Sequence, residues 1–188
     1  MADGITWLRI PDEEELPSEV LELWAPSLEK LGFVPNVLRL YALRPSHLLA
    51  WNAHHDVLMK GDSSLSKAER EMIIVATSAA NQCHYCVIAH GAILRVYAKN
   101  PLIADQVAVN YRKADLTARE MAMLDFALKV ALDSHAISDA DFAPLAAHGF
   151  SDEDIWDIGA IAALFALSNR MANLIHMRPN DEFYLLGR

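Results

Sequence analysis

The chain is 188 residues long, with 53% hydrophobic residues, 22% charged residues and a formal net charge of −9. A chain of this size can bury roughly two thirds or more of its unfolded surface in one core, so it needs no disulfide to fold. The negative charge disfavours nucleic acids and anionic membranes as partners, because clustered Lys and Arg are needed to bind either.

Two further features bear on where the protein works and whether it assembles. Residues 1–17 carry acidic side chains where an export signal would carry basic ones and then an apolar run, so we expect a cytoplasmic protein. The longest apolar run, residues 158–167, spans about half of the roughly 20 residues of a transmembrane helix, which predicts a buried helix. The apolar fraction is high for a monomer, so we expect a homo-oligomer.

Apolar residues recur at helical spacing along nearly the whole chain, and no alternating stretch long enough for a strand stands between turn signals. Helices are predicted near residues 18–31, 36–43, 46–60, 66–80, 83–99, 102–112, 117–133, 139–147 and 151–175, with Pro26 as a candidate break in the first. We predict a single all-α domain over residues 1–188. It comprises an N-terminal helical extension over about 1–60, a core over about 61–175, and a tail over 176–188 that we expect to be irregular and to dock on a neighbour.

Several predicted helices begin with a Ser or Thr whose side chain can accept a hydrogen bond from a free backbone N–H. An acidic residue follows three positions later in each case, which is the pattern of a capping box. These pairs are Ser66 with Glu69, Thr117 with Glu120, Ser138 with Asp141, and Ser151 with Asp154.

The most informative stretch is EREMIIVATSAANQCHYCVIAHG, residues 69–91, which holds both cysteines of the chain. Two helices joined by a short turn near Asn81 are expected to form an antiparallel hairpin that places Glu71 opposite His90. Cys83, Cys86 and His90 follow the spacing i, i+3, i+7, so they share one helix face. The four side chains can therefore form one site.

The chemistry of this set is that of a reactive thiol. Cys83 stands at the start of its helix, where free N–H groups and the helix dipole lower the pKa of a thiol. Cys86 lies one turn from His90, and Glu71 can orient that imidazole and pass protons. The spacing of the cysteines also suits a disulfide. We therefore predict a redox-active pair with a Glu71 and His90 proton relay.

Metal binding and covalent haem are weaker interpretations. Cys83 and His90 are separated by roughly 10 Å along a regular helix, too far for ligands that must each lie about 2.0–2.3 Å from one zinc ion. Cys86, His90 and Glu71 alone could still share a metal. Val87 stands where covalent haem attachment requires a histidine. We predict no metal and no cofactor, and the cysteines could also be plain core residues.

The pattern Glu71-x11-Cys83-x2-Cys86-x3-His90 resembles the alkylhydroperoxidase D-like group of the carboxymuconolactone decarboxylase superfamily. Three stretches are similar to its subgroup of peroxidase-related enzymes: LGFVPNVLRLYALRPSHLLAW, LSKAEREMIIVATSAANQCHYCVIAHGAILR and ALFALSNRMAN. The resemblance implies an all-helical alkylhydroperoxidase D-like bundle, assembly into a dimer, trimer or hexamer, and reduction of a small-molecule hydroperoxide at the expense of an external dithiol or lipoyl-type reductant.

The resemblance also implies a role for each residue of the site. Cys86 would attack the peroxide, Cys83 would be the resolving partner nearer the surface, and His90 and Glu71 would relay protons. One departure is Tyr85, which stands where the best-described relatives have a histidine. His84, one position earlier, is expected on the solvent side.

Two other functions stay open at this point: an oligomeric redox sensor without efficient turnover, and a decarboxylase-type relative in which the cysteines are not catalytic. Among the remaining polar residues, His54 and His55 are neighbours on a helix, so at most one can face a given site. Asn169 and Arg170 interrupt an apolar stretch and are expected to form a salt bridge or a subunit contact.

Overall fold

The computed structural model describes residues 4–188, and all regular secondary structure in that range is helical. The α-helices are α1 (Ser18–Leu31), α2 (Asn36–Tyr41), α3 (Pro45–Lys60), α4 (Lys67–Ala80), α5 (His84–Ala98), α6 (Ile103–Asn110), α7 (Ala118–Asp133), α8 (Phe142–Ala147) and α9 (Asp152–Leu174). Short 3-10 turns occupy Glu13–Glu15, Tyr111–Lys113, Ser134–Ala136, Asp139–Asp141 and Asp181–Tyr184 (η5). The all-α prediction is confirmed.

The expected break at Pro26 is wrong, because α1 continues through it to Leu31. Val20 and Trp24 bury one face of this helix, and Gly32 ends it in a left-handed conformation with φ 79°. Packing of the buried face therefore keeps the helix intact although Pro26 lacks an N–H, and Gly32 rather than Pro26 ends it.

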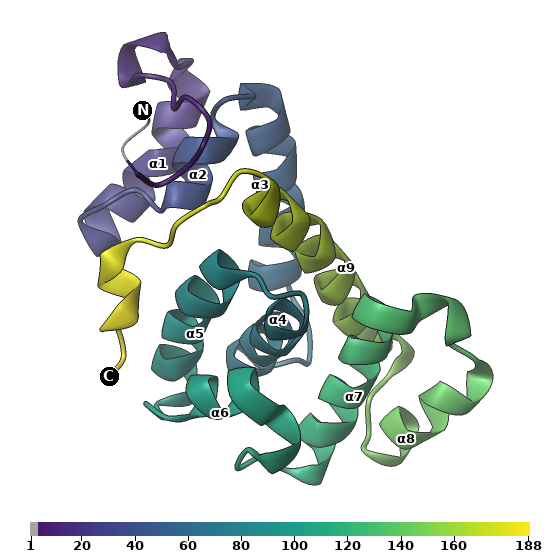
Figure 1. The fold of residues 1–188 in the computed structure, drawn as a ribbon. Helices are drawn as coiled ribbons and strands as arrows, with labels where there is room; N and C mark the ends of the chain where they lie inside the picture. The colour runs from purple at the N-terminus through teal and green to yellow at the C-terminus, as the bar shows by residue number, and fades with distance from the viewer. Residues whose placement is uncertain (1–3) are drawn as a thin grey trace.

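Helix α4 lies at the centre of the bundle, where Figure 1 shows it nearly end-on, and α5, α6, α7 and α9 pack against it. Residues 69–78 are buried without interruption. A helix enclosed in this way is mostly apolar or small, as the run IIVATSAA is, and its buried charged residues Glu69, Arg70 and Glu71 each have a polar partner. The predicted antiparallel hairpin is not seen as a separate unit in the described part of the chain, because α5 is one of several helices that enclose α4.

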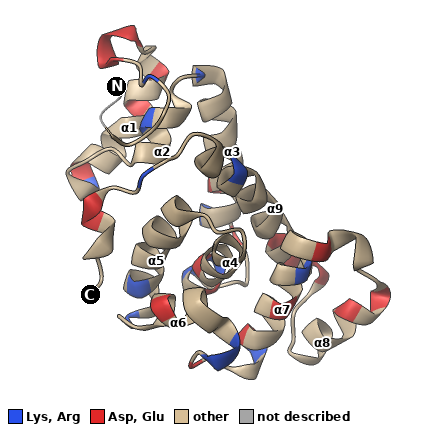
Figure 2. Cartoon of the chain, viewed as in Figure 1, with Lys and Arg blue, Asp and Glu red and all other residues tan. Residues whose placement is uncertain are grey.

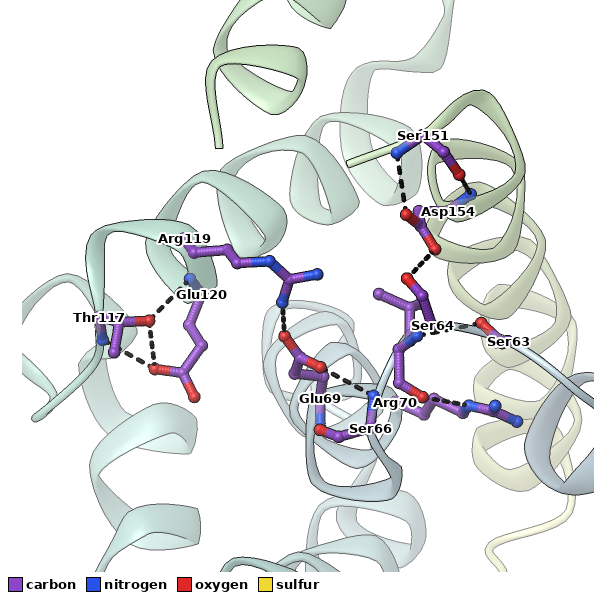
Figure 3. Close-up of polar contacts among 11 residues, drawn as sticks. Ser63, Ser64, Ser66, Glu69, Arg70, Thr117, Arg119, Glu120, Ser151 and Asp154 are labelled. Atoms are coloured by element: carbon purple, nitrogen blue, oxygen red, sulfur yellow. Dashed lines mark hydrogen bonds and ion pairs between the residues drawn. The ribbon is translucent and has the colours of Figure 1, made fainter. Parts of the chain in front are cut away.

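Capping boxes begin α4, α7 and α9 at the predicted residues, and Figure 3 shows their polar contacts. Glu69 of the first box also pairs with Arg119 on α7, whose guanidinium lies 3.9 Å from the centre of the Phe150 ring. Asp154 of the last box accepts a hydrogen bond from Ser64, just before α4. These contacts join the N-terminal ends of α4, α7 and α9 and so fix the position of α4 along its axis in the bundle.

The N-terminal helices and the C-terminal tail cover the α4 and α5 end of the bundle. α2 packs on α3, and α3 packs on α9. The tail, expected to be irregular, forms the short turn η5 and packs on α5 of its own chain, and its docking on a neighbour stays a prediction. There Arg95 donates hydrogen bonds to the carbonyls of Phe183 (2.8 Å) and Leu186 (3.0 Å).

Charged residues are distributed over several elements, and Figure 2 shows the basic positions scattered rather than gathered on one helix. No helix within residues 4–188 combines the length and apolarity needed to cross a membrane.

Candidate active site

Cys83 lies at the junction of α4 and α5. Its N–H donates to the carbonyl of Ser78 (2.9 Å), and the N–H of Gln82 donates to that of Ala79 (3.0 Å). Gln82 has φ 53°, so the turn is a Schellman motif with a left-handed residue after the helix. The same turn makes Cys83 the N-cap residue of α5. The thiol predicted to stand at a helix start does so.

The two cysteines are free thiols, and the exposed fractions of Cys83 and Cys86 are 1% and 3%. The more exposed position expected for Cys83 is therefore not seen. Hydrogen bonding by the Cys86 thiol, aided by the Cys86 backbone N–H, lowers the pKa of Cys83 to about 7 despite burial. The same hydrogen bond and burial raise the pKa of Cys86. Above a pH of about 7 the pair therefore favours one negative charge and one proton between its two sulfur atoms.

A polar chain from α4 and α9 reaches the sulfur atoms. Asn81 donates through Nδ2 to Oδ1 of Asn169 (3.0 Å), and Asn169 donates through Nδ2 to Oγ of Ser78 (2.9 Å). Hydrogen bonding by Asn169 and Ser78 favours the charged form of Cys86 and partly offsets the rise in its pKa. Both side chains are buried. They stabilise negative charge on sulfur from within the core.

The salt bridge expected of Asn169 and Arg170 is not seen within residues 4–188, and a subunit contact of Arg170 stays a prediction. Asn169 faces the cysteines, whereas Arg170 is exposed and donates to the carbonyl of Ala166 on its own helix (2.7 Å). Successive helix positions diverge by about 100°, so one polar residue of the pair enters the core and the other leaves it. The only sequence signal was an amide in a buried apolar stretch.

His90 and Glu71 meet as predicted. Nδ1 of His90 lies 2.7 Å from Oε2 of Glu71, and their side chains are 13% and 6% exposed. The ring of Phe165 packs edge-on against the imidazole with centroids 4.7 Å apart. The carboxylate and this ring hold the imidazole on the helix face that carries Cys86, so its orientation is set before any substrate binds.

An aromatic row extends from His90 toward α2. His55 lies 6.3 Å from Phe165, Trp51 lies 5.3 Å from His55, and Tyr41 lies 4.9 Å from Trp51, measured between ring centroids. Burial lowers the pKa of His55, which therefore favours its neutral form. His54 is exposed, in line with the expectation that only one of these neighbouring histidines faces inward.

The comparisons with known proteins agree with this geometry. The family model described as "Carboxymuconolactone decarboxylase family" matches residues 45–127, which include all four predicted site residues. A crystal structure of the alkylhydroperoxidase AhpD core of an uncharacterized peroxidase-related protein from Ralstonia eutropha is 59% identical, with a TM-score of 0.97. The match covers 100% of this chain and 98% of that one. The chain belongs to the carboxymuconolactone decarboxylase family, and it is AhpD-like.

Two other structures show how far the AhpD-like fold extends. An uncharacterized peroxidase-related protein from a Silicibacter species is 43% identical, with a TM-score of 0.94 and coverage of 99% of this chain and 97% of that one. The debrominase Bmp8 is 19% identical over 97% of this chain and 95% of its own, with a TM-score of 0.77. At that identity the likeness concerns the fold alone. No curated protein matches the chain.

Tyr85 and His84 differ from the arrangement expected of this family. The hydroxyl of Tyr85 accepts a hydrogen bond from the backbone N–H of Val37 (3.2 Å), so Tyr85 ties α5 to the beginning of α2. Nε2 of His84 lies 2.8 Å from the hydroxyl of Tyr184, at the exposed surface. Neither side chain extends the proton relay. Tyr85 has become a buried structural residue, and His84 contacts the tail on the solvent side as expected.

A metal site would need at least three side chains that converge on one ion. Within residues 4–188, no group of three or more His, Cys, Asp or Glu side chains is arranged to hold a metal ion. Cys86, His90 and Glu71, which the sequence left open as a weak alternative, do not form such a group.

The pKa of Cys83 predicts how the reduced protein responds to pH. As pH falls through about 7, Cys83 gains a proton, so the rate at which iodoacetamide alkylates it should fall with a midpoint near pH 7. An unperturbed thiol would show a midpoint of about 8.5. In Cys86→Ala the main cause of the lowered pKa is gone, and the midpoint should rise. Peptide mass spectrometry over pH 5–10 measures both, and equal midpoints in the two proteins would contradict the assignment.

Proposed function

We propose that the chain is a thiol-dependent peroxidase that reduces alkyl hydroperoxides through Cys83 and Cys86, with Glu71 and His90 handling protons. One observation carries the proposal. Two hydrogen-bonded free thiols at the start of α5 lie in the same buried site as an imidazole fixed 2.7 Å from a carboxylate. The names of the similar structures from Ralstonia eutropha and Silicibacter, both peroxidase-related, support it.

In the proposed cycle Cys86 is the attacking sulfur. Its proton first passes to Cys83 along the hydrogen bond between the thiols. The Cys86 thiolate then attacks the terminal oxygen of the hydroperoxide, so that the O–O bond breaks, an S–O bond forms, and the alkoxide takes a proton from the His90 and Glu71 pair. Cys83 attacks the resulting sulfenic acid, a disulfide forms and water leaves. An external dithiol returns two electrons by thiol–disulfide exchange.

The test is a stoichiometric oxidation of the reduced protein. One equivalent of cumene hydroperoxide should remove both free thiols and leave one intramolecular disulfide, and added dihydrolipoamide should support many turnovers. A protein that keeps both thiols under these conditions is not a peroxidase. One that forms the disulfide but does not turn over with any dithiol is better described as a redox sensor. The reductant, the homo-oligomer and the cytoplasmic location stay predictions.

A further inference from the structure

Tyr41, the last residue of α2, has a buried hydroxyl that lies near the hydroxyl of Ser168 but makes no hydrogen bond of normal geometry. The residue is 6% exposed, and its oxygen is among the buried side-chain atoms of the described chain that lack a partner. Buried polar atoms are nearly always hydrogen-bonded, since leaving one unpaired costs about 1–3 kcal/mol. An unpaired hydroxyl in the core therefore indicates a group that binds something absent from the resting protein.

The neighbours of Tyr41 bring its ring close enough to the cysteines for their charge to affect its hydroxyl. At the other end of α2, Val37 is bonded to Tyr85, the residue next to Cys86. Trp51 packs on the Tyr41 ring and donates through Nε1 to Oγ of Ser168 (3.1 Å), and Ser168 adjoins the Asn169 that faces both sulfur atoms.

The electrostatics of the hydroxyl agree with this position. Burial raises the pKa of Tyr41 to about 12, and negative charge on Cys86 is the next cause. The phenol therefore keeps its proton at any pH at which the site works. It can donate a hydrogen bond but does not compete with His90 and Glu71 as an acid.

We propose that the Tyr41 hydroxyl donates a hydrogen bond to the hydroperoxide oxygen that Cys86 attacks, and then to the sulfenic acid that carries this oxygen. The inference rests on the proposed function and adds a catalytic residue to it. No proton is transferred from the phenol: the sulfur loses two electrons, the O–O bond breaks, and the alkoxide is protonated by the His90 and Glu71 pair. Tyr41 stabilises the charge that shifts through the reacting oxygen.

The experiment compares two reactions of the same sulfur. In a Cys83→Ser background only Cys86 reacts, and adding Tyr41→Phe removes a single oxygen atom from the site. Oxidation by cumene hydroperoxide, followed by trapping of the sulfenic acid with dimedone, should slow roughly 10- to 100-fold, which is the worth of one hydrogen bond to a charged group. Alkylation of Cys86 by iodoacetamide transfers no oxygen to sulfur and should change less than about twofold.

Controls separate this role from a structural one. Because the hydroxyl makes no hydrogen bond of normal geometry, Tyr41→Phe should unfold at a urea concentration close to that of its parent. Tyr111→Phe removes a hydroxyl that lies in the 3-10 turn Tyr111–Lys113 and donates to Asp125 on α7 (2.7 Å), and it should leave both rates at Cys86 unchanged. Equal oxidation rates with and without the Tyr41 hydroxyl overturn the inference, and so does an equal slowing of oxidation and alkylation.

The parent protein distinguishes failure of the inference from failure of the function. If Cys86 with Tyr41 intact reacts with the hydroperoxide no faster than a small free thiol of the same pKa, the peroxidase proposal is wrong and the role of Tyr41 falls with it. If it reacts faster and Tyr41→Phe makes no difference, the function stands and only the inference is wrong.

Discussion

Cys86→Ser is expected to reduce hydroperoxides at least about 1000-fold more slowly than the parent, because a serine hydroxyl is not ionised at neutral pH and cannot become a sulfenic acid. The steady-state rate with dihydrolipoamide and cumene hydroperoxide measures this loss. The substitution nearly preserves volume in a site only 3% exposed, so the urea midpoint should change little.

Cys83→Ser is the matched control, since it changes the same atom three positions earlier. It should consume one equivalent of hydroperoxide and stop at a sulfenic acid on Cys86, because no second sulfur is available to form the disulfide. Because the pKa of Cys83 is lowered, Cys83 is the more readily ionised thiol, and the experiment also tests whether it attacks the peroxide first. If Cys86→Ser reacts once with peroxide while Cys83→Ser does not react, Cys83 is the attacking sulfur and the two proposed roles are exchanged.

Glu71→Gln is expected to lower kcat/KM for the hydroperoxide by about 100-fold, at the lower end of what a positioned acid or base contributes. The amide keeps the shape of the side chain but removes the negative charge 2.7 Å from Nδ1 of His90, so the imidazole loses the partner that orients it. Stopped-flow oxidation under single-turnover conditions measures this step apart from reduction by the dithiol.

A double-mutant cycle tests whether Glu71 and His90 act as a unit. If they do, Glu71→Gln with His90→Gln should be no slower than His90→Gln alone, since residues of one relay are not additive. His84→Gln is the control, because His84 is an exposed histidine on the same helix that contacts Tyr184 instead. Fully additive losses would mean that the two residues do not form a relay, and a large loss in His84→Gln would bring that residue into the site.

Residue patterns predicted the helices and also the four residues Glu71, Cys83, Cys86 and His90. Capping boxes such as Ser66 with Glu69 act within one turn, and so does the spacing of Cys83, Cys86 and His90 along α5. These are short-range features, and the physics that creates them is contained in a few neighbouring residues. The meeting of Glu71 with His90 also follows from local information, since a short turn joins their helices.

What surrounds the sulfur atoms depends on the packing of helices and could not be predicted from the sequence. Asn169 comes from α9 and Tyr41 from α2, and each reaches the site through the packing of helices that are distant in sequence. Periodicity shows that such residues lie on a buried helix but not what they face, because the rotation and depth of a helix depend on its partners. The same limit explains the burial of Cys83, which the family resemblance implied would lie nearer the surface, and the docking of the tail on α5.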